Sequence, residues 1–251
     1  RGGQLGLDVT LVEADAYGGT CLNDGCIPSK ALIPGSGLAH EVEHAESMGL
    51  HARADVDMQG LVGWKDGVVD QLTGGVEKLC KANGVNLLSG RAEFVDEHTA
   101  RVVHGGDGQG SESIEFEHAI VATGSRPIEL PGLAFDSERI LSSANVLSLE
   151  SLPESLLVVG GGYIGMELST MLAKLGTEVT VVEMLDDILP GYDEDVTRLV
   201  RKRAEELGIE FHFGEAAQGW EEVAAAARVR TETEDGETSE YTAERVLVAV
   251  L

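Results

Sequence analysis

The hexapeptide Gly160–Gly165, Gly-Gly-Gly-Tyr-Ile-Gly, is the feature that most restricts the fold of this chain of 251 residues. An apolar run at 156–159 precedes it and predicts a strand, and the residues after it predict a helix to 175 and a second strand at 178–183. A glycine turn between a strand and a helix, followed by another strand, is typical of a Rossmann-type unit that binds a dinucleotide.

Each glycine has a role in such a turn. Gly160 permits the tight turn, Gly162 lets the backbone approach a pyrophosphate, and Gly165 allows close packing of the helix on the strand. The helix N-terminus offers free N–H groups and a positive dipole to the phosphates. Glu183, at the end of the next strand, can accept hydrogen bonds from both ribose hydroxyls and would repel a 2′-phosphate. The pattern therefore predicts an NAD site and disfavours NADP.

Cys21 and Cys26 are the second informative feature. Four intervening residues that include Gly25 permit a disulfide bond, whose Cβ atoms must lie about 3.8 Å apart. So short a loop removes little entropy from the unfolded chain, so a redox role explains the pair better than stabilisation does. The spacing alone also allows two buried thiols or half of a zinc site, although the remaining cysteine, Cys80, offers no second ligand pair.

The residues around these cysteines carry a family resemblance. Residues 18–30, Gly-Gly-Thr-Cys-Leu-Asn-Asp-Gly-Cys-Ile-Pro-Ser-Lys, resemble the active-site segment of the flavin-dependent pyridine nucleotide–disulfide oxidoreductases. With Leu22, Ile27 and Ser29 the segment resembles dihydrolipoamide dehydrogenases most, and haloarchaeal members in particular. The resemblance covers essentially the whole chain but begins and ends inside the family pattern. We therefore expect a piece of a longer enzyme, truncated at both ends and inactive by itself.

The resemblance implies an α/β fold with two Rossmann-like, three-layer domains, both incomplete here. Residues 1–135 would form the FAD-binding domain without its first strand and glycine loop, and residues 136–251 the NAD-binding domain inserted in it. The rest of the FAD domain, the dimerisation domain and the catalytic base, which the family draws from a His-x-x-x-x-Glu pair, would lie outside the chain.

The resemblance also assigns roles to individual residues. Cys26 would be the thiol next to the flavin, and Cys21 the one that exchanges with a substrate disulfide. Lys30 would lie beside the flavin ring and stabilise negative charge there, although a solvated helix lysine is the alternative. The expected FAD contacts are Glu13, Gly19, Thr20, Lys30, Ala92, Ala122, Thr123 and Gly124. The expected NAD contacts are Gly160, Gly162, Tyr163, Ile164, Gly165, Glu167 and Glu183.

Two of these assignments have plain alternatives. Glu167 could be an ordinary acidic residue in the first turn of a helix, where the helix dipole favours it. The Ala122–Gly124 turn is a common sequence that carries little weight by itself. His40 and His44 lie four residues apart on a predicted helix without an evident third ligand, so we expect no metal there.

The resemblance implies the oxidation of dihydrolipoamide, free or on a lipoyl domain, by NAD through the dithiol and FAD, in a homodimer. A mercuric or glutathione reductase-like enzyme is the alternative within the class, and Glu183 disfavours the NADP-dependent glutathione enzymes. A non-catalytic NAD-binding fragment with inert thiols is the alternative outside it.

The charge balance restricts the partners and the compartment. With 44 acidic and 18 basic residues, the formal net charge is −26, which disfavours nucleic acid and anionic membranes as partners. So large an excess favours a high-salt cytoplasm, where counterions screen the repulsion, over a merely acidic soluble protein. We expect no membrane span, since no apolar stretch approaches about 20 residues. Three cysteines fit a reducing compartment.

The remaining pattern predicts the elements around these motifs. We expect a helix from Lys30 to about Leu50, interrupted near Pro34, and a long helix over 58–82 that buries Cys80. Further expected elements are strands at 8–13, 85–88, 92–95, 100–103, 114–116 and 118–123, a loop at 105–110, a helix at 193–207, a strand at 209–213, a hairpin that turns at Asp235-Gly236, and a last strand at 245–250.

Overall fold

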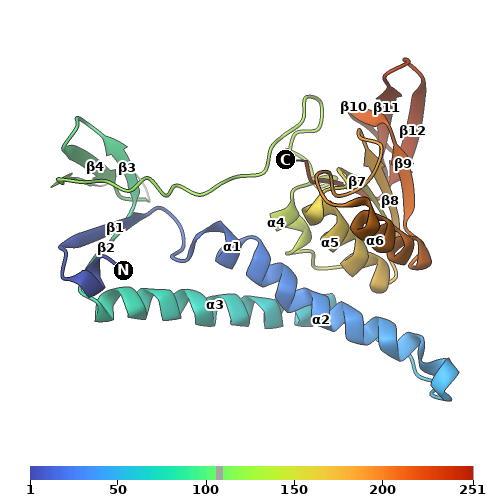
Figure 1. Cartoon of the computed structure of the whole chain (residues 1–251), viewed down its shortest axis with the longest axis horizontal. Coiled ribbons are helices and arrows are strands. Elements are labelled where there is room, and N and C mark those ends of the chain that lie inside the picture. The colour runs from blue at the N-terminus through green and yellow to red at the C-terminus, as the bar shows by residue number, and fades with distance from the viewer. Residues whose placement is uncertain (106–109, 251) are drawn as a thin grey trace. The chain divides into compact units, whose positions relative to one another are not determined.

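The computed structural model describes residues 1–105 and 110–250, which form two compact units drawn in Figure 1. Unit 1 contains Arg1–Asn23 and Gly67–Ser125, and unit 2 contains Asp24–Asp66 and Arg126–Leu251. Most of the loop expected at 105–110 lies outside the described residues. The two units are taken in turn.

A parallel sheet forms the centre of unit 2. Its strands β6 (Ile140–Leu141), β13 (Arg245–Val248), β7 (Ser155–Val159), β8 (Glu178–Glu183) and β9 (Glu210–Phe213) follow one another in that order, and all neighbours are parallel. Helix α5 (Tyr163–Lys174) connects β7 to β8. The α/β class and the strand–helix–strand unit predicted around the glycine turn are confirmed.

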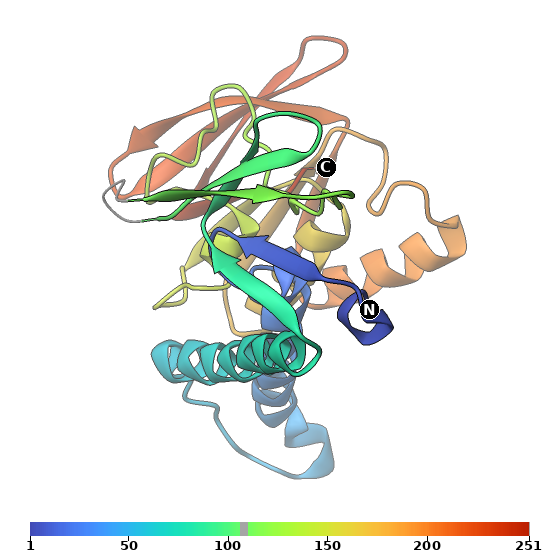
Figure 2. The ribbon, with the colours of Figure 1, turned by 90° about the vertical axis from the view of Figure 1, so that its left-hand side faces the viewer.

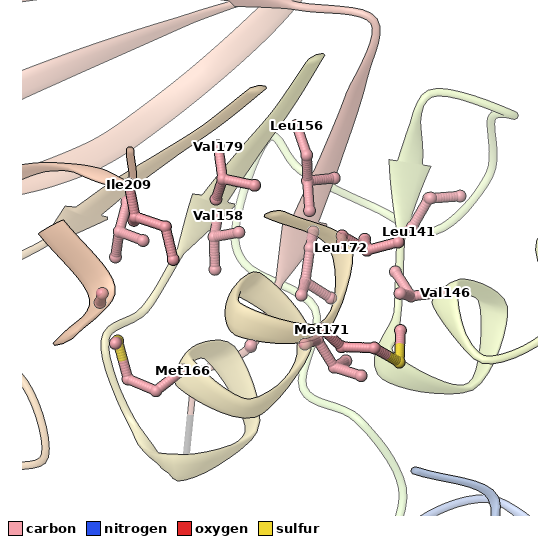
Figure 3. Packing of buried hydrophobic residues seen from close by; sticks show 14 of the residues in the cluster. Leu141, Val146, Leu156, Val158, Met166, Met171, Leu172, Val179 and Ile209 are labelled. Carbon is pink, nitrogen blue, oxygen red and sulfur yellow. The ribbon is translucent and has the colours of Figure 1, made fainter. Parts of the chain in front are cut away.

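Both faces of this sheet are covered. On one face Leu156 and Val158 point from β7 toward Met166 and Leu172 of α5 (Figure 3). Leu157, which lies between these two residues in the sequence, belongs to a second buried cluster on the other face. A strand that is buried on both sides has a continuous apolar sequence. Burial of each such side chain contributes roughly 1.5–3 kcal/mol to the stability of the fold. This packing fixes β7, and with it the turn that follows.

An antiparallel sheet covers the second face. It contains β10 (Glu215–Val223), β11 (Ala226–Thr233) and β12 (Thr238–Ala243), and buried Ala227 and Val229 of β11 belong to the same cluster as Leu157. The hairpin predicted at Asp235-Gly236 is present between β11 and β12, with Gly236 at φ +81°. Strand β10 was not expected. Unit 2 therefore has three layers: helix, parallel sheet and antiparallel sheet.

Helix α2 (Cys26–Glu43) passes through Pro34 without a break, so the interruption expected there is wrong. Proline removes one backbone donor and crowds the carbonyl four residues earlier, but a well-packed helix tolerates that cost. Ala31, Leu32 and Ser36 of α2 are buried around the proline and hold the helix together. The remaining helices of unit 2 are η2 (Ala45–Met48), α4 (Ser143–Val146) and α6 (Glu194–Glu206).

Unit 1 is built on a parallel pair of strands that lie side by side in Figure 2. Strand β1 (Val9–Glu13) follows η1 (Gly3–Leu5) and pairs with β2 (Val85–Ser89). The strands expected at 92–95, 100–103 and 114–116 are present as an antiparallel sheet of β3 (Arg91–Phe94), β4 (Thr99–Val103) and β5 (Ser111–Glu115). Helix α1 (Gly19–Asn23) completes the unit together with the C-terminal part of α3.

The long helix α3 (Met58–Ala82) has the predicted bounds and belongs to unit 2 through Asp66 and to unit 1 from Gly67. Cys80 on it is only partly buried, so the expectation of a buried thiol is too strong.

The prediction of a strand at 118–123 is wrong. These residues belong to no strand, and the side chain of Ile120 is 94% exposed. An apolar, β-branched run forms a strand only when a neighbouring strand takes up its N–H and C=O groups, and no strand within the described residues does so here.

No helix in residues 1–105 and 110–250 combines the length and apolar character that crossing a membrane requires.

Candidate functional site

The glycine turn between β7 and α5 has the backbone that the sequence predicts. Gly160 has φ +112°, and a Cβ atom on it would lie 2.6 Å from the carbonyl oxygen of Ala249 on the neighbouring chain segment. A Cβ atom on Gly165 would collide with the carbonyl oxygen of Gly160. The positive φ and the close backbone at Gly160, and the close backbone alone at Gly165, leave room only for glycine at these positions. The first turn of α5 is thereby pressed against the end of β7.

Glu183 closes this turn. The carboxylate is 8% exposed; its Oε2 accepts the N–H of Gly161 at 2.6 Å, and its Oε1 accepts the N–H of Leu185 at 2.8 Å. A buried carboxylate with two backbone donors remains an acceptor with spare lone pairs, and its negative charge stays beside the turn. The residue predicted to select a ribose without a 2′-phosphate thus also shapes the turn. Gly161 had no predicted role.

Helix α5 begins with Gly162 as its N-cap, and Tyr163 and Ile164 occupy its first turn. Tyr163 is exposed and Ile164 partly buried. The first N–H groups of a helix have no partner within the helix and, with the helix dipole, favour an anion. The predicted NAD residues of 160–165 and Glu183 therefore lie together at the carboxyl ends of β7 and β8, in a form that suits a pyrophosphate and a ribose.

Lys30 and Glu167 meet in unit 2. Nζ of Lys30 on α2 lies 2.6 Å from Oε1 and 3.0 Å from Oε2 of Glu167 on α5. Ser29 adds a hydrogen bond from its hydroxyl to Oε2 at 3.3 Å. Sequence reasoning assigned Lys30 to the flavin and Glu167 to the nicotinamide, but it missed their pairing and gave Ser29 no role. No short-range pattern could indicate a contact between residues 137 positions apart.

A half-open, mostly apolar cavity of about 270 Å³ lies beside this pair between α2, α5 and α6. Ile33 of α2 and Met166 of α5 line it, and Tyr163 and Glu167 belong to its lining as well. Two residues predicted to contact NAD therefore also face a pocket.

The two cysteines lie on consecutive helices. Cys21 is in α1 of unit 1, and Cys26 is the first residue of α2 in unit 2. Both are exposed thiols in the structure. Asn23, between them, anchors the end of α1: its amide donates to the carbonyl of Gly19 at 3.1 Å, and its Oδ1 accepts the hydroxyl of Thr73 at 3.0 Å. The redox pairing of the cysteines stays a prediction.

Several residues predicted to hold FAD lie in unit 1. Thr20 and Gly124 are brought together, because Oγ1 of Thr20 accepts the N–H of Ser125 at 3.4 Å and would lie 2.9 Å from a Cβ atom on Gly124. Gly19 and Gly124 have φ values of +78° and +74°, which glycine favours. The predicted backbone turn is therefore held against the segment that carries the first cysteine.

The other predicted FAD residues occupy separate places in the unit. Glu13 ends β1 and accepts the N–H of Asp15 at 3.0 Å, the same contact that Glu183 makes with Leu185. Ala122 and Thr123 precede Gly124 on the exposed, unpaired segment. Ala92 lies exposed on β3, opposite Val102. Their roles in binding stay predictions.

The histidine pair on α2 packs on itself. The rings of His40 and His44 are 4.0 Å apart, and Nδ1 of His44 lies 2.9 Å from the carbonyl oxygen of His40. Burial, followed by the neighbouring His44 and Lys174, lowers the pKa of His40. Within the described residues, no group of three or more His, Cys, Asp or Glu side chains could hold a metal ion.

The comparison with protein families decides the affiliation of this arrangement. The family described as pyridine nucleotide-disulphide oxidoreductase matches residues 1–250. The chain belongs to this family. The fold, the glycine turn and the segment of residues 18–30 thus occur in a chain of this family.

Curated relatives are dihydrolipoyl dehydrogenases. The chain is 68% identical over 250 residues to dihydrolipoyl dehydrogenase 2 of Haloarcula marismortui and 67% identical over 250 residues to the dihydrolipoyl dehydrogenase of Haloferax volcanii. It is 46% identical over 251 residues to that of Geobacillus stearothermophilus. These matches cover 100% of this chain and 53%, 53% and 52% of the relatives. The chain spans about half the length of the curated relatives it matches.

Solved structures agree. LpdA from Mycobacterium tuberculosis matches with a TM-score of 0.87 and 28% identity over 97% of this chain and 52% of that one. The Cu(II) complex of the HOCl-induced flavoprotein disulfide reductase RclA from Escherichia coli matches with a TM-score of 0.83 and 25% identity over 98% of this chain and 52% of that one. The resemblance seen in residues 18–30 is therefore confirmed at the level of the family.

Proposed function

We propose that the full-length protein is an NAD-dependent dihydrolipoyl dehydrogenase that binds FAD. The observation that carries the proposal is the Lys30–Glu167 pair, which ties the helix that begins at Cys26 to the helix that follows the dinucleotide turn. The dihydrolipoyl dehydrogenases among the relatives support the choice of substrate.

The residues present fit both cofactors. For NAD, the glycine-only turn and the buried carboxylate of Glu183 suit a pyrophosphate and an unphosphorylated ribose. For FAD, Glu13 would take the ribose, and Thr20 with the Gly124 turn would approach the cofactor with backbone atoms. We propose residues 1–135 as the FAD-binding domain and 136–251 as the NAD-binding domain.

The dithiol step follows from thiol chemistry. One substrate thiolate attacks the sulfur of Cys21 in a Cys21–Cys26 disulfide, and the Cys21–Cys26 bond breaks to leave Cys26 as a thiolate. The second substrate thiolate then attacks the substrate sulfur of the mixed disulfide, forms the cyclic disulfide and releases Cys21. The two electrons of the substrate reside on the reduced sulfurs of Cys21 and Cys26, and its two protons go to the base expected outside this chain and to the released Cys21 thiolate.

FAD, when bound, would supply the redox chemistry that passes these two electrons to NAD⁺. Lys30 holds a positive charge at the start of α2, where it would stabilise negative charge that develops on reduction, and Glu167 fixes its position. Glu183 and the glycine turn orient the coenzyme. As partners we propose dihydrolipoamide or a lipoyl domain, and a second copy of the full-length chain in a homodimer. We propose a cytoplasmic location, which the three cysteines and the acidic composition support.

Assays of the full-length protein test the proposal. The protein should reduce NAD with dihydrolipoamide, contain a bound flavin with a visible spectrum, and release two additional thiols on reduction. C21S and C26S should each abolish turnover, whereas C80S should keep it, because Cys80 lies on α3 and is not part of the segment of residues 18–30. If the protein were active only with glutathione disulfide or Hg(II), dihydrolipoamide would be the wrong substrate. If the protein were colourless and its thiols did not respond to oxidant, it would be a non-catalytic NAD-binding protein.

A further inference from the structure

Ser29 is a buried residue without a role in the function proposed above. It lies at the start of α2 with 5% of its surface exposed. Its hydroxyl oxygen is 3.2 Å from the carbonyl oxygen of Cys26 and 3.3 Å from Oε2 of Glu167. Solvent thus has little access to the hydroxyl, and its two acceptors belong to a cysteine of the proposed dithiol and to the carboxylate that pairs with Lys30.

A serine hydroxyl has one hydrogen and donates to one acceptor at a time. A hydrogen bond to a carboxylate is roughly twice as strong as one to a neutral carbonyl. Glu167 is therefore the preferred acceptor of Ser29, and the Cys26 carbonyl, three residues earlier on the helix, is the weaker one. The preferred bond joins α2 to α5 across 138 positions of sequence.

The carboxylate of Glu167 is held from two sides. Lys30 lies closer to Oε1, at 2.6 Å, than to Oε2, at 3.0 Å, which is also the oxygen that Ser29 contacts. The last torsion of a glutamate side chain is broad and does not fix the carboxylate plane by itself. A second donor on Oε2 removes this freedom and leaves Oε1 directed to Lys30.

We propose that Ser29 is a positioning residue that fixes the Glu167 carboxylate and, through it, the ammonium group of Lys30. The inference rests on the proposed function, in which Lys30 stabilises charge beside the flavin and Glu167 fixes the position of Lys30. In this role Ser29 would act through Glu167 and not by contact with substrate or coenzyme. Without its hydroxyl the carboxylate can rotate, and Lys30 follows it.

A double-mutant cycle in the full-length protein tests this. The variants are S29A, E167Q and S29A/E167Q, with S29T as the conservative variant that keeps the hydroxyl. In urea unfolding, S29A and E167Q should each lower the midpoint, and the double variant should lie no lower than the worse single variant, because both remove the same contact.

The kinetic readout separates positioning from a merely structural role. S29A should lower kcat about tenfold while KM for dihydrolipoamide stays within about twofold, and S29T should recover most of kcat. S29A should lower kcat no further in the E167Q background. Additive losses in the cycle, or a kcat unchanged in S29A, would overturn the inference.

The unfolding and kinetic measurements together distinguish a failure of this inference from a failure of the proposed function. If the wild-type protein does not oxidise dihydrolipoamide, the proposed function fails, and the unfolding cycle still decides whether Ser29 and Glu167 are coupled. If the wild type is active and both cycles are additive, only the role of Ser29 fails.

Discussion

The carboxylate of Glu183 accepts the N–H of Gly161 at 2.6 Å, so the acid at the end of β8 closes the glycine turn at the end of β7. Its other oxygen binds the N–H of Leu185. Glu13 makes the corresponding contact with the residue two positions later, Asp15, at the end of β1. Glu183 therefore combines two functions in one side chain: it holds the turn in shape and places a negative charge where a coenzyme ribose would lie.

We expect E183Q to lose stability and coenzyme selectivity together. A glutamine offers one acceptor oxygen and places an NH₂ group against the second backbone N–H, which costs about 1–3 kcal/mol. Without the negative charge, the ratio of kcat/KM for NAD to that for NADP should also fall. Urea unfolding and coenzyme kinetics of the full-length protein measure both effects. E178Q, at the exposed start of the same strand, is the matched control and should change neither. An unchanged coenzyme ratio in E183Q would contradict the assigned role.

Two glycine-to-alanine substitutions in helices should have opposite signs. In G165A the new Cβ meets the backbone oxygen of Gly160, so the turn must open and stability should fall by about 2 kcal/mol or more. In G63A on α3 the new Cβ meets nothing within 4 Å, and helix propensity should raise stability by up to about 1 kcal/mol. Urea midpoints give the comparison, and NAD affinity should fall only in G165A. Equal effects of the two substitutions would show that the close approach at Gly160 has no energetic weight.

The sequence indicates the strand–helix–strand unit of 155–183 almost to the residue, because Gly160 follows the first strand, Gly176 follows the helix, and the strands are mostly apolar. It fails where a tertiary contact decides the outcome. The run at 118–123 has a strand pattern, but no strand within the described residues takes up its backbone groups. Pro34 predicts a break, but buried neighbours on α2 maintain the helix.

The same distinction applies to the candidate site. The glycine turn and Glu183 follow from spacing within a single local unit, and the role of Lys30 was suggested by the family resemblance. The contacts of Ser29 and Lys30 with Glu167 join two helices that are distant in the sequence, and no periodicity or motif indicates them. The partly buried contacts of Glu215 with Thr231 and Tyr241 were missed because they too join separate elements of the chain.

The net charge of −26 predicts that salt stabilises the protein. The Debye length shortens from about 10 Å in 0.1 M salt to about 3 Å in 1 M salt, so repulsion between surface carboxylates weakens. The urea midpoint should therefore rise between 0.1 and 2 M KCl. The variant E232Q/E234Q removes two exposed charges and should show a smaller rise. A midpoint that falls with KCl, or the same slope in both proteins, would contradict this explanation.

Tyr241 on β12 should make stability depend on pH in the alkaline range. Burial and the hydrogen bond to Glu215 raise the pKa of Tyr241 to about 12, compared with about 10 in the unfolded chain. The unfolded state therefore releases its proton first, and the contribution of Tyr241 is complete below about pH 10 and disappears between about pH 10 and 12. Y241F removes the hydroxyl that lies 3.0 Å from Glu215, so its urea midpoint should be lower than that of the wild type at pH 8, and the difference should shrink at pH 11. Y192F, on a tyrosine that is 60% exposed, is the control and should follow the wild type at both pH values. A difference between Y241F and wild type that is constant from pH 8 to 11 would exclude titration of Tyr241 as the cause.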